Sequence, residues 1–363
     1  MNILMRVTRM AIFIAGLVVL SLGLINGSAS AKTIKMTVAA GQPPHLLGIK
    51  FLRDYFIPEV DKRIAAAGLD FKIKWTQAYA GALCKATKCI FAVQDGITDI
   101  GFVPTIFHPD KLPLEGVGFV TPFLTDQVKI VTDVMDDLHR SIPEMGKQYE
   151  KYNQIRLAGG GIDTYHIIAT FPIRSIDDVK GRKIGTAGGA LAWMRGTGAV
   201  PVQSNMMLYY NSTKTGVYDG FIVFPSSYLP FKYTEVAPYV NMFNFGAQYA
   251  QAATMNKDSF AKLPPAVQKI FREVAIVYRE KNDGGYQAFS AKSLKLVAKK
   301  PGVTLVKISD KERRRWAMAM PNLAKEWVQQ REKQGLPGKK VLTAYMNGVR
   351  KAGVKPIRNW DKE

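Results

Sequence analysis

Histidine, acidic and aromatic side chains gather at points where predicted strands end. Three of the four histidines, His45, His108 and His166, lie in or beside such loops. An imidazole can hydrogen-bond a carboxylate and makes capture of a ligand sensitive to pH, whereas His108 is also explained as an ordinary polar loop residue. Asp163 stands near His166, but one carboxylate with scattered histidines lacks metal-ligand spacing. The sequence therefore predicts a hydrogen-bonding site with no metal and no cofactor.

The arrangements that catalysis needs do not appear in the chain. No Gly-x-Ser-x-Gly elbow occurs, and residues 225–227 (PSS) lack its glycines. The carboxylate pairs at 136–137 and 177–178 are adjacent in sequence, so they diverge on a helix and belong to the surface. Residues 159–161 (GGG) lack the Lys-Ser/Thr of a phosphate loop and are predicted to form a flexible crossing between two halves. We therefore expect that the protein is not an enzyme.

The two cysteines, Cys84 and Cys89, are five residues apart. In an oxidising compartment this spacing predicts a local disulfide. An unbroken helix across both positions would turn the side chains to different faces, which is the condition that would prevent the bond.

The N-terminus predicts export. Arg6 and Arg9 precede an apolar run that reaches about Ile25, and the small residues 29–31 (ASA) follow it. This order is that of a signal peptide cleaved after Ala31; the alternative, a membrane anchor, would need a longer apolar run. Removing 31 of 363 residues leaves 332 and lowers the net charge by two arginines, from +21 to +19. We expect a periplasmic protein.

A chain of this size exceeds one comfortable core, which predicts two lobes. The high positive charge is typical of nucleic-acid binders, but export removes that partner. The cations are spread out, with residues 313–315 (RRR) the one tight cluster, so anionic solutes or an anionic membrane face are what such a surface attracts.

Strand-like and helix-like segments alternate along the chain. Alternating or buried apolar runs predict strands, and helical spacing follows in residues 46–56 and 85–95. This order predicts an α/β fold with mostly parallel sheets and helices on both faces. The predicted strands are 33–39, 71–75, 100–103, 167–171, 183–184 and 220–224.

The last third is helical. Pro264 and Pro265 suit the start of a long helix that runs toward Val297 and bridges the lobes. A capping box of Ser309 and Glu312 opens a further helix, which Pro321 should kink. Similarly, Ser175, Asp178 and Gly181 delimit a one-turn helix. We predict lobe I at residues 32–160 plus about 251–285, and lobe II at residues 161–250 plus about 286–363.

Four segments, in order, resemble one family, the solute receptors of TRAP (tripartite ATP-independent periplasmic) transporters. They are residues 92–102 (AVQDGITDIGF), 173–184 (IRSIDDVKGRKI), 215–220 (TGVYDG) and 262–264 (KLP). The resemblance implies the two-lobed periplasmic binding protein fold, a small organic acid in the cleft between lobes, and two membrane partners, a small and a large integral subunit. It implies transport driven by an ion gradient. We expect a monomer.

The chain departs from this family where relatives place arginines. Gly185 stands where many relatives anchor the ligand carboxylate, and Tyr165 aligns with a second arginine. A guanidinium holds a carboxylate by two parallel bonds, so its loss predicts either another cation or a less acidic, neutral or aromatic solute. Arg182, Lys183 and Arg195 are the nearest candidate cations. The receptor arm of an ABC importer or of a sensor is the alternative assignment.

In such sheets ligands bind beyond the carboxyl ends of the strands. This rule predicts a set of ligand-binding residues on the loops of both lobes. They are Gln42, His45, Gln77, Tyr79, Pro104, Thr105, Asp163, Tyr165, His166, Thr186, Gly188, Phe224, Gln248 and Tyr249. The aromatic residues Tyr209, Tyr210, Phe221 and Phe224 form either an apolar wall of this site or ordinary core. Ligand contacts to both lobes would favour a closed state by hinge motion.

Overall fold

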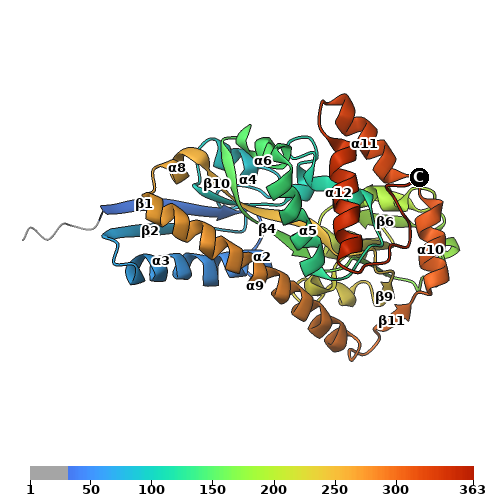
Figure 1. Ribbon diagram of the computed structural model, residues 1–363. Coiled ribbons are helices and arrows are strands. Elements are labelled where there is room, and N and C mark those ends of the chain that lie inside the picture. The colour runs from blue at the N-terminus through green and yellow to red at the C-terminus, as the bar shows by residue number, and fades with distance from the viewer. Residues whose placement is uncertain (1–31) are drawn as a thin grey trace, which may run out of the picture.

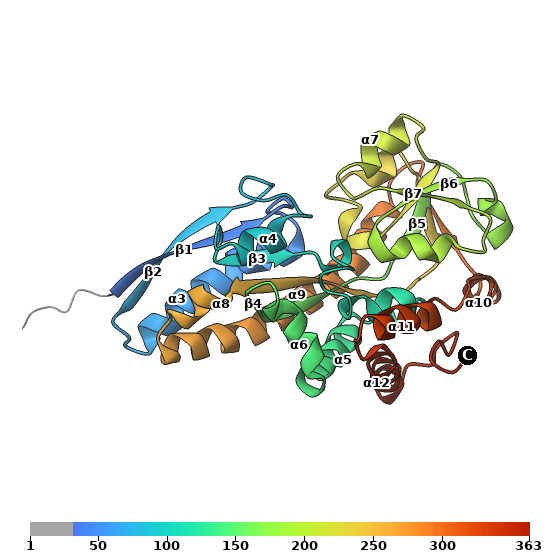
Figure 2. The ribbon, with the colours of Figure 1, turned by 90° about the horizontal axis from the view of Figure 1, so that it is seen from above.

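The computed structural model describes residues 32–363, and the predicted signal peptide of residues 1–31 lies outside them. Two lobes lie side by side, each built on its own β-sheet (Figures 1 and 2). The predicted two-lobed α/β fold is confirmed. No helix within residues 32–363 combines the length and the apolar character that crossing a membrane requires.

The sheet of the first lobe has five strands. Strand β1 pairs in parallel with β2 and β3, while β10 runs antiparallel between β3 and β4. The sheet is therefore mixed but mostly parallel, as predicted, because β1, β2, β3 and β4 run in one direction and β10 alone is reversed. Across the sheet the order is β2 (Phe71–Ala78), β1 (Lys32–Ala40), β3 (Ile100–Val103), β10 (Gln248–Asn256) and β4 (Gln154–Ile162).

The sheet of the second lobe has six strands and is mixed as well. Strand β5 is antiparallel to both of its neighbours, β8 and β9, whereas the pairs β6–β7, β6–β8 and β9–β11 are parallel. The order is β11 (Thr304–Lys307), β9 (Tyr239–Met242), β5 (His166–Ala169), β8 (Gly220–Val223), β6 (Lys183–Thr186) and β7 (Val200–Gln203).

Helices cover both faces of the first sheet, α3 and α9 on one side and α4 on the other (Figures 1 and 2). The predicted helix at residues 46–56 is part of a longer continuous helical segment, whose middle turn is π-helical. The α-helices before the long one are α2 (Leu47–Phe51), α3 (Ile57–Ala66), α4 (Cys89–Gln94), α5 (Val128–Ser141), α6 (Pro143–Glu150), α7 (Tyr209–Lys214) and α8 (Lys257–Ala261). The short helical turns are η1 (Leu52–Phe56), η2 (Thr105–Phe107), η3 (Glu115–Val120), η4 (Ile176–Val179), η5 (Gly188–Met194), η6 (Pro225–Ser227) and η7 (Tyr233–Glu235).

The long helix α9 (Pro265–Val297) links the lobes as predicted. With 33 residues it is about 50 Å long. It packs along α2, α3 and β4 in the first lobe and against η6 in the second (Figure 1). Pro265 at its first turn needs no amide partner there, which explains why the helix begins at this point.

The C-terminal helices are α10 (Asp310–Ala319), α11 (Leu323–Lys333) and α12 (Gly338–Lys351). The Ser309 side chain accepts the Glu312 amide, as the capping box predicts. The prediction of a kink at Pro321 is wrong, because the chain breaks there into two helices and Asn322 caps the second through the Lys325 amide. Ser175 and Asp178 form the other predicted capping box, at η4.

The three glycines at 159–161 form a buried part of strand β4, so the prediction of a flexible crossing is wrong. Each glycine is in close contact with a neighbouring side chain. A Cβ on Gly159 would lie 1.6 Å from the Tyr249 hydroxyl oxygen, and one on Gly161 would lie 2.5 Å from Val128. Close packing of side chains onto the strand, and not flexibility, explains the run of glycines.

The predicted disulfide between Cys84 and Cys89 is confirmed, with the two Cα atoms 5.0 Å apart. The predicted helix at 85–95 starts only at Cys89, so Cys84 lies in the loop before it. The bond forms because the helix does not extend across both cysteines.

Candidate functional site

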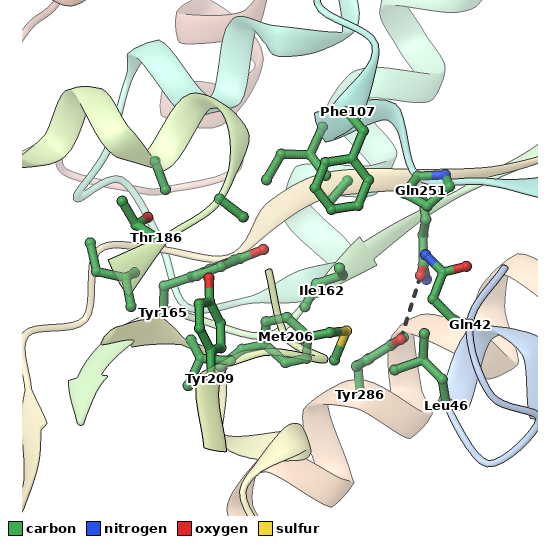
Figure 3. A pocket seen from close by; sticks show the side chains of 18 of the residues that line it. Gln42, Leu46, Phe107, Ile162, Tyr165, Thr186, Met206, Tyr209, Gln251 and Tyr286 are labelled. Atoms are coloured by element: carbon green, nitrogen blue, oxygen red, sulfur yellow. Dashed lines mark hydrogen bonds between the residues drawn. The ribbon is translucent and has the colours of Figure 1, made fainter. Parts of the chain in front are cut away.

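An apolar cavity lies where the two lobes meet, lined from both sheets and by α9 (Figure 3). Its volume is about 70 Å³, small for a ligand site, and it is partly open to solvent. Its lining residues are Gln42, Leu46, Phe102, Pro104, Ile106, Phe107, Ile162, Tyr165, Thr186, Ala187, Ala190, Met206, Tyr209, Ile222, Val223, Phe224, Ala250, Gln251 and Tyr286.

Gln42 reaches the cavity from the turn after β1. The loop that contains the disulfide packs directly on this turn, because a Cβ on Gly41 would lie 2.0 Å from the Ala86 amide nitrogen. Ala80 also donates its amide to the Gln42 carbonyl oxygen at 2.9 Å. The turn that carries Gln42 is therefore held by the loop that Cys84 and Cys89 close.

Aromatic rings form the wall of the second lobe. The Tyr165 ring makes edge-to-face contacts with Phe224 at 5.3 Å and with Trp193 at 5.6 Å between ring centroids. Tyr209 stacks on Phe221 at 4.6 Å. Such packing fixes the ring positions before any ligand arrives.

Some of the polar groups on the cavity wall already have partners. Gln251 donates to Asn282 at 3.1 Å and accepts from the Tyr286 hydroxyl at 3.4 Å (Figure 3). By contrast, the buried oxygens Gln42 Oε1 and Thr186 Oγ1 have no hydrogen-bond partner among residues 32–363. A buried polar atom without a partner is costly, so these two are positioned to bind a ligand.

The cavity lining contains no aspartate, glutamate, lysine, arginine or histidine. Burial raises the pKa of the Tyr165 and Tyr209 phenols, so both hydroxyls stay protonated. They are hydrogen-bond donors and acceptors without charge.

The structure divides the predicted site residues into two groups. Gln42, Pro104, Tyr165, Thr186 and Phe224 line the cavity. The others do not, and the list of ligand-binding residues stays a prediction.

Asp163 and His166 flank the cavity but have other partners. Asp163 accepts the Ser226 amide at 2.9 Å and the Ser226 hydroxyl at 2.6 Å. Its burial raises the pKa of the carboxyl group to about 6. His166 lines a second cavity with Arg313 and Ser290, and its Nδ1 accepts the Asn244 amide at 2.9 Å.

Three more of the predicted residues are on or near the cleft rim. Gly188 packs on Ile106, a cavity residue, and adopts φ +52°. Thr105 is buried one residue beyond Pro104. The exposed His45 has its ring 5.8 Å from that of Phe231, which belongs to the other lobe.

The remaining ones lie away from the cavity. Tyr79 donates its hydroxyl to Gln77 at the protein surface. Tyr249 accepts a hydrogen bond from Arg156 at 2.7 Å. Gln248 points toward Gly118, whose Cβ would lie 2.9 Å from the Gln248 Oε1 atom.

None of the three candidate cations lines the cavity. Arg195 forms a two-point ion pair with Glu326 at 2.6 and 2.9 Å, so it does not reach into the cavity. Arg182 lies over the Phe171 ring at 4.4 Å, and Lys183 is exposed.

Gly185 leaves no space for a side chain. A Cβ there would lie 2.8 to 2.9 Å from the ring of Tyr218. The ring of Tyr218 therefore fills the space that a side chain at position 185 would need.

Sequence reasoning missed several lining residues that lie within helices or strands and not on the loops that follow them. Tyr286 lies inside α9, and Ile162 ends β4. A register shift between Tyr249 and Gln251 in β10 explains why Gln251 lines the cavity and Tyr249 does not. Of these, only Tyr286 had a usable signal, its place on the helix predicted to span both lobes.

Among residues 32–363 no group of three or more histidine, cysteine, aspartate or glutamate side chains is arranged to hold a metal ion. A cleft of this shape, apolar and built by two sheets joined by a long helix, is typical of solute-binding proteins. The family model described as bacterial extracellular solute-binding protein, family 7, matches residues 69–331. The chain belongs to this family. Its members are solute receptors and not enzymes, and the sequence resemblance to TRAP receptors is confirmed.

Solved structures share the fold at low sequence identity. A TRAP periplasmic solute-binding protein from Desulfovibrio salexigens is 22% identical, with a TM-score of 0.76 over 88% of this chain and 96% of that one. One from Rhodoferax ferrireducens with copurified benzoate is 17% identical, with a TM-score of 0.76 over 88% and 98%. One from Bordetella bronchiseptica with bound mandelate is 20% identical, with a TM-score of 0.74 over 88% and 99%.

Proposed function

We propose that this protein is the periplasmic solute receptor of a TRAP-type secondary transporter, and that it captures a small organic solute in the cavity between its lobes. The observation that carries the proposal is a cavity to which both lobes and the long helix contribute, with Gln42 on one side, Tyr165 and Thr186 on the other, and Tyr286 from α9. A ligand that touches both sides stabilises the state in which the lobes are close together.

The small size of the cavity supports a hinge motion. A space of about 70 Å³ is small for a solute, so we propose that the lobes are further apart when the solute enters. The predicted lobe boundaries, residues 32–160 plus about 251–285 and residues 161–250 plus about 286–363, are the bodies that we propose to move. The closed form is the one that the small and large membrane subunits would recognise.

The compartment supports this role. The signal peptide proposed for residues 1–31 would export the chain, the disulfide suits an oxidising compartment, and the related structures are of periplasmic proteins. Genes for a small and a large membrane subunit beside the gene of this protein are what the proposal expects; a gene for an ATPase there would favour an ABC importer.

Thermal unfolding in the presence of a library of organic acids, amides, phenols and polyols tests the proposal. Binding at about micromolar affinity, roughly −8 kcal/mol, should raise the melting temperature when the solute is in large excess. The same solute should reduce the radius of gyration in X-ray scattering. If no small solute raises the melting temperature or changes the scattering, the receptor function is wrong.

A further inference from the structure

We infer that the solute is uncharged: a flat, ring-bearing molecule with a hydrogen-bonding group at each end. This inference rests on the proposed receptor function and narrows its ligand class. It goes against the organic acids that the resemblance implies and follows the alternative that the missing arginines leave open.

The first observation is the absence of a counter-ion for a carboxylate. The cavity lining contains no aspartate, glutamate, lysine, arginine or histidine side chain. Arg195 is held outside by Glu326, and these two side chains are about half exposed; Arg182 lies over the Phe171 ring and 3.9 Å from Asp219. A carboxylate buried here would lose its hydration without an ion pair, which costs several kcal/mol.

The second observation is a buried carboxyl group beside the cavity. Asp163 is 1% exposed and lies two positions before Tyr165; burial first, and the Asp163 charge as a smaller cause, raises the pKa of Tyr165 and Tyr286. An anion in the cavity would be repelled by this group when it is ionised. Asp163 is itself held by two hydrogen bonds from Ser226, so it does not act as a cation-binding arm either.

The third observation is the distribution of the free polar atoms. Gln42 lies at one end of the cavity, and Tyr165, Tyr209 and Thr186 lie at the other, with Ile162, Met206 and Phe107 between them (Figure 3). Gln42 Oε1 lacks a partner, so a donor on the solute would satisfy it, while Nε2 of the same amide can donate. A hydroxyl or amide N–H at that end, and a carbonyl or hydroxyl at the tyrosine end, satisfies both sides.

The ring that we infer for the solute is based on the aromatic side chains of the cavity walls. Tyr165 and Tyr209 belong to two aromatic stacks that are locked by Trp193, Phe224 and Phe221. Rigid rings on the walls favour a planar partner, which gains edge-to-face or offset-stacked contacts. Phenols, aromatic amides and aldehydes, and unsaturated lactams share this chemistry.

Matched pairs of equal shape and different charge test the inference on the wild-type protein. We would titrate benzamide against benzoate, and 4-hydroxybenzamide against 4-hydroxybenzoate, by calorimetry at pH 7.5. The amide of each binding pair should bind about tenfold or more tightly than the carboxylate, because only the carboxylate has a charge to bury. Tighter binding of the carboxylates would overturn the inference and leave the receptor function intact.

A pH series separates the two ligand classes without any variant. If only the neutral acid enters, the apparent affinity for benzoate should fall about tenfold for each pH unit above the pKa of the acid, since the binding form is depleted in proportion. An affinity for benzoate that stays constant from pH 5 to 7.5 contradicts the inference. No binding by any member of the solute library would instead mean that the receptor function itself fails.

Position 165 offers a change of specificity. Tyr165→Arg places a guanidinium where relatives align an arginine, so benzoate should gain affinity at pH 7.5 relative to benzamide. Tyr165→Phe keeps the ring and removes only the hydroxyl, so it should weaken benzamide without improving benzoate. If Tyr165→Arg does not fold, the amide and carboxylate titrations of the wild-type protein and the pH series still test whether the solute is uncharged.

Discussion

At the scale of single residues, alternation along one strand separates two kinds of chemistry. Tyr165 and His166 are neighbours at the start of β5, and their side chains point to opposite faces. Tyr165 therefore lines the cavity between the lobes, whereas His166 lines a separate polar cavity beside Arg313. Adjacent residues that look like one cluster in the sequence serve two sites.

Burial, and then the nearby Arg313, lowers the pKa of His166 to about 3 from its ordinary 6.5. The unfolded chain takes up this proton below pH 6.5 but the folded protein does not, so stability present above pH 6.5 is lost as the pH falls toward 3. His166→Asn keeps an acceptor for the Asn244 amide and removes the titration. Urea unfolding between pH 4 and 7 should show a shallower loss of stability in this variant.

The control is His45→Asn, which changes an exposed histidine on the cleft rim. The wild type and both variants are compared over the same pH range. Asp163, whose pKa is raised to about 6, acts in the opposite direction, and the comparison between variants cancels its contribution. Equal slopes for His166→Asn and the wild type would contradict the assignment.

At the scale of elements, two neighbouring glycines on α9 are expected to respond in opposite ways to the same substitution. Gly284 and Gly285 are consecutive helical residues, yet a Cβ on Gly284 has nothing within 4 Å, whereas one on Gly285 would lie 2.4 Å from the Phe51 ring. Gly284→Ala should stabilise the protein by about 0.5–1 kcal/mol, since alanine suits a helix better than glycine. Gly285→Ala should destabilise it by about 1–3 kcal/mol through overpacking.

Chemical denaturation of both variants checks this pair. Because the two changes are identical in chemistry and differ only in what surrounds them, each is the control for the other. A destabilised Gly284→Ala would show that the helix is constrained at that position by something other than its neighbours within 4 Å.

The loop closed by Cys84 and Cys89 belongs to the same scale. Replacing both cysteines with alanine frees a short loop in the unfolded chain and should cost about 2 kcal/mol of unfolding free energy. Since Ala86 in this loop packs on Gly41, amide hydrogen exchange should also rise at residues 41–46. Faster exchange confined to the loop itself would show that it does not hold the turn of Gln42.

At the scale of the whole molecule, buried ion pairs tie the long helix to its neighbours. Arg279 on α9 pairs with Asp133 on α5 at 2.6 Å, with Asp136 at 3.4 Å and with Asp283 at 3.5 Å. Asp136 also pairs with Arg156 on β4. The network connects helix α9, helix α5 and strand β4.

Arg279→Met should lower the unfolding free energy by about 1–3 kcal/mol, because it leaves the buried Asp283 carboxyl group without its cation, whereas Asp133 is 39% exposed and Asp136 keeps Arg156. Lys50→Met, which removes an exposed pair with Asp54, should cost less than about 1 kcal/mol. Calorimetric melting of the two variants checks the contrast. Equal effects would mean that the buried network is not a main source of stability.

The sequence by itself determined the features that depend on neighbours in the chain. Apolar spacing and the prolines at 264–265 define α9, Ser309 and Ser175 cap their helices, and the oxidised cysteine pair follows from spacing and compartment. These signals suffice because helix periodicity, capping and a short disulfide involve residues within a few positions of one another. Four short motifs were enough for the family.

Only the tertiary structure decided the features that depend on distant partners. Arg195 meets Glu326 from 131 positions away, and Asp163 meets Ser226 from 63. The antiparallel entry of β10 brings Gln251 beside Tyr286, and Tyr218 fills the space at Gly185. The cavity carries no charge because charged side chains such as Arg195 and Asp163 bind partners outside it. Local sequence patterns contain no information about these distant partners.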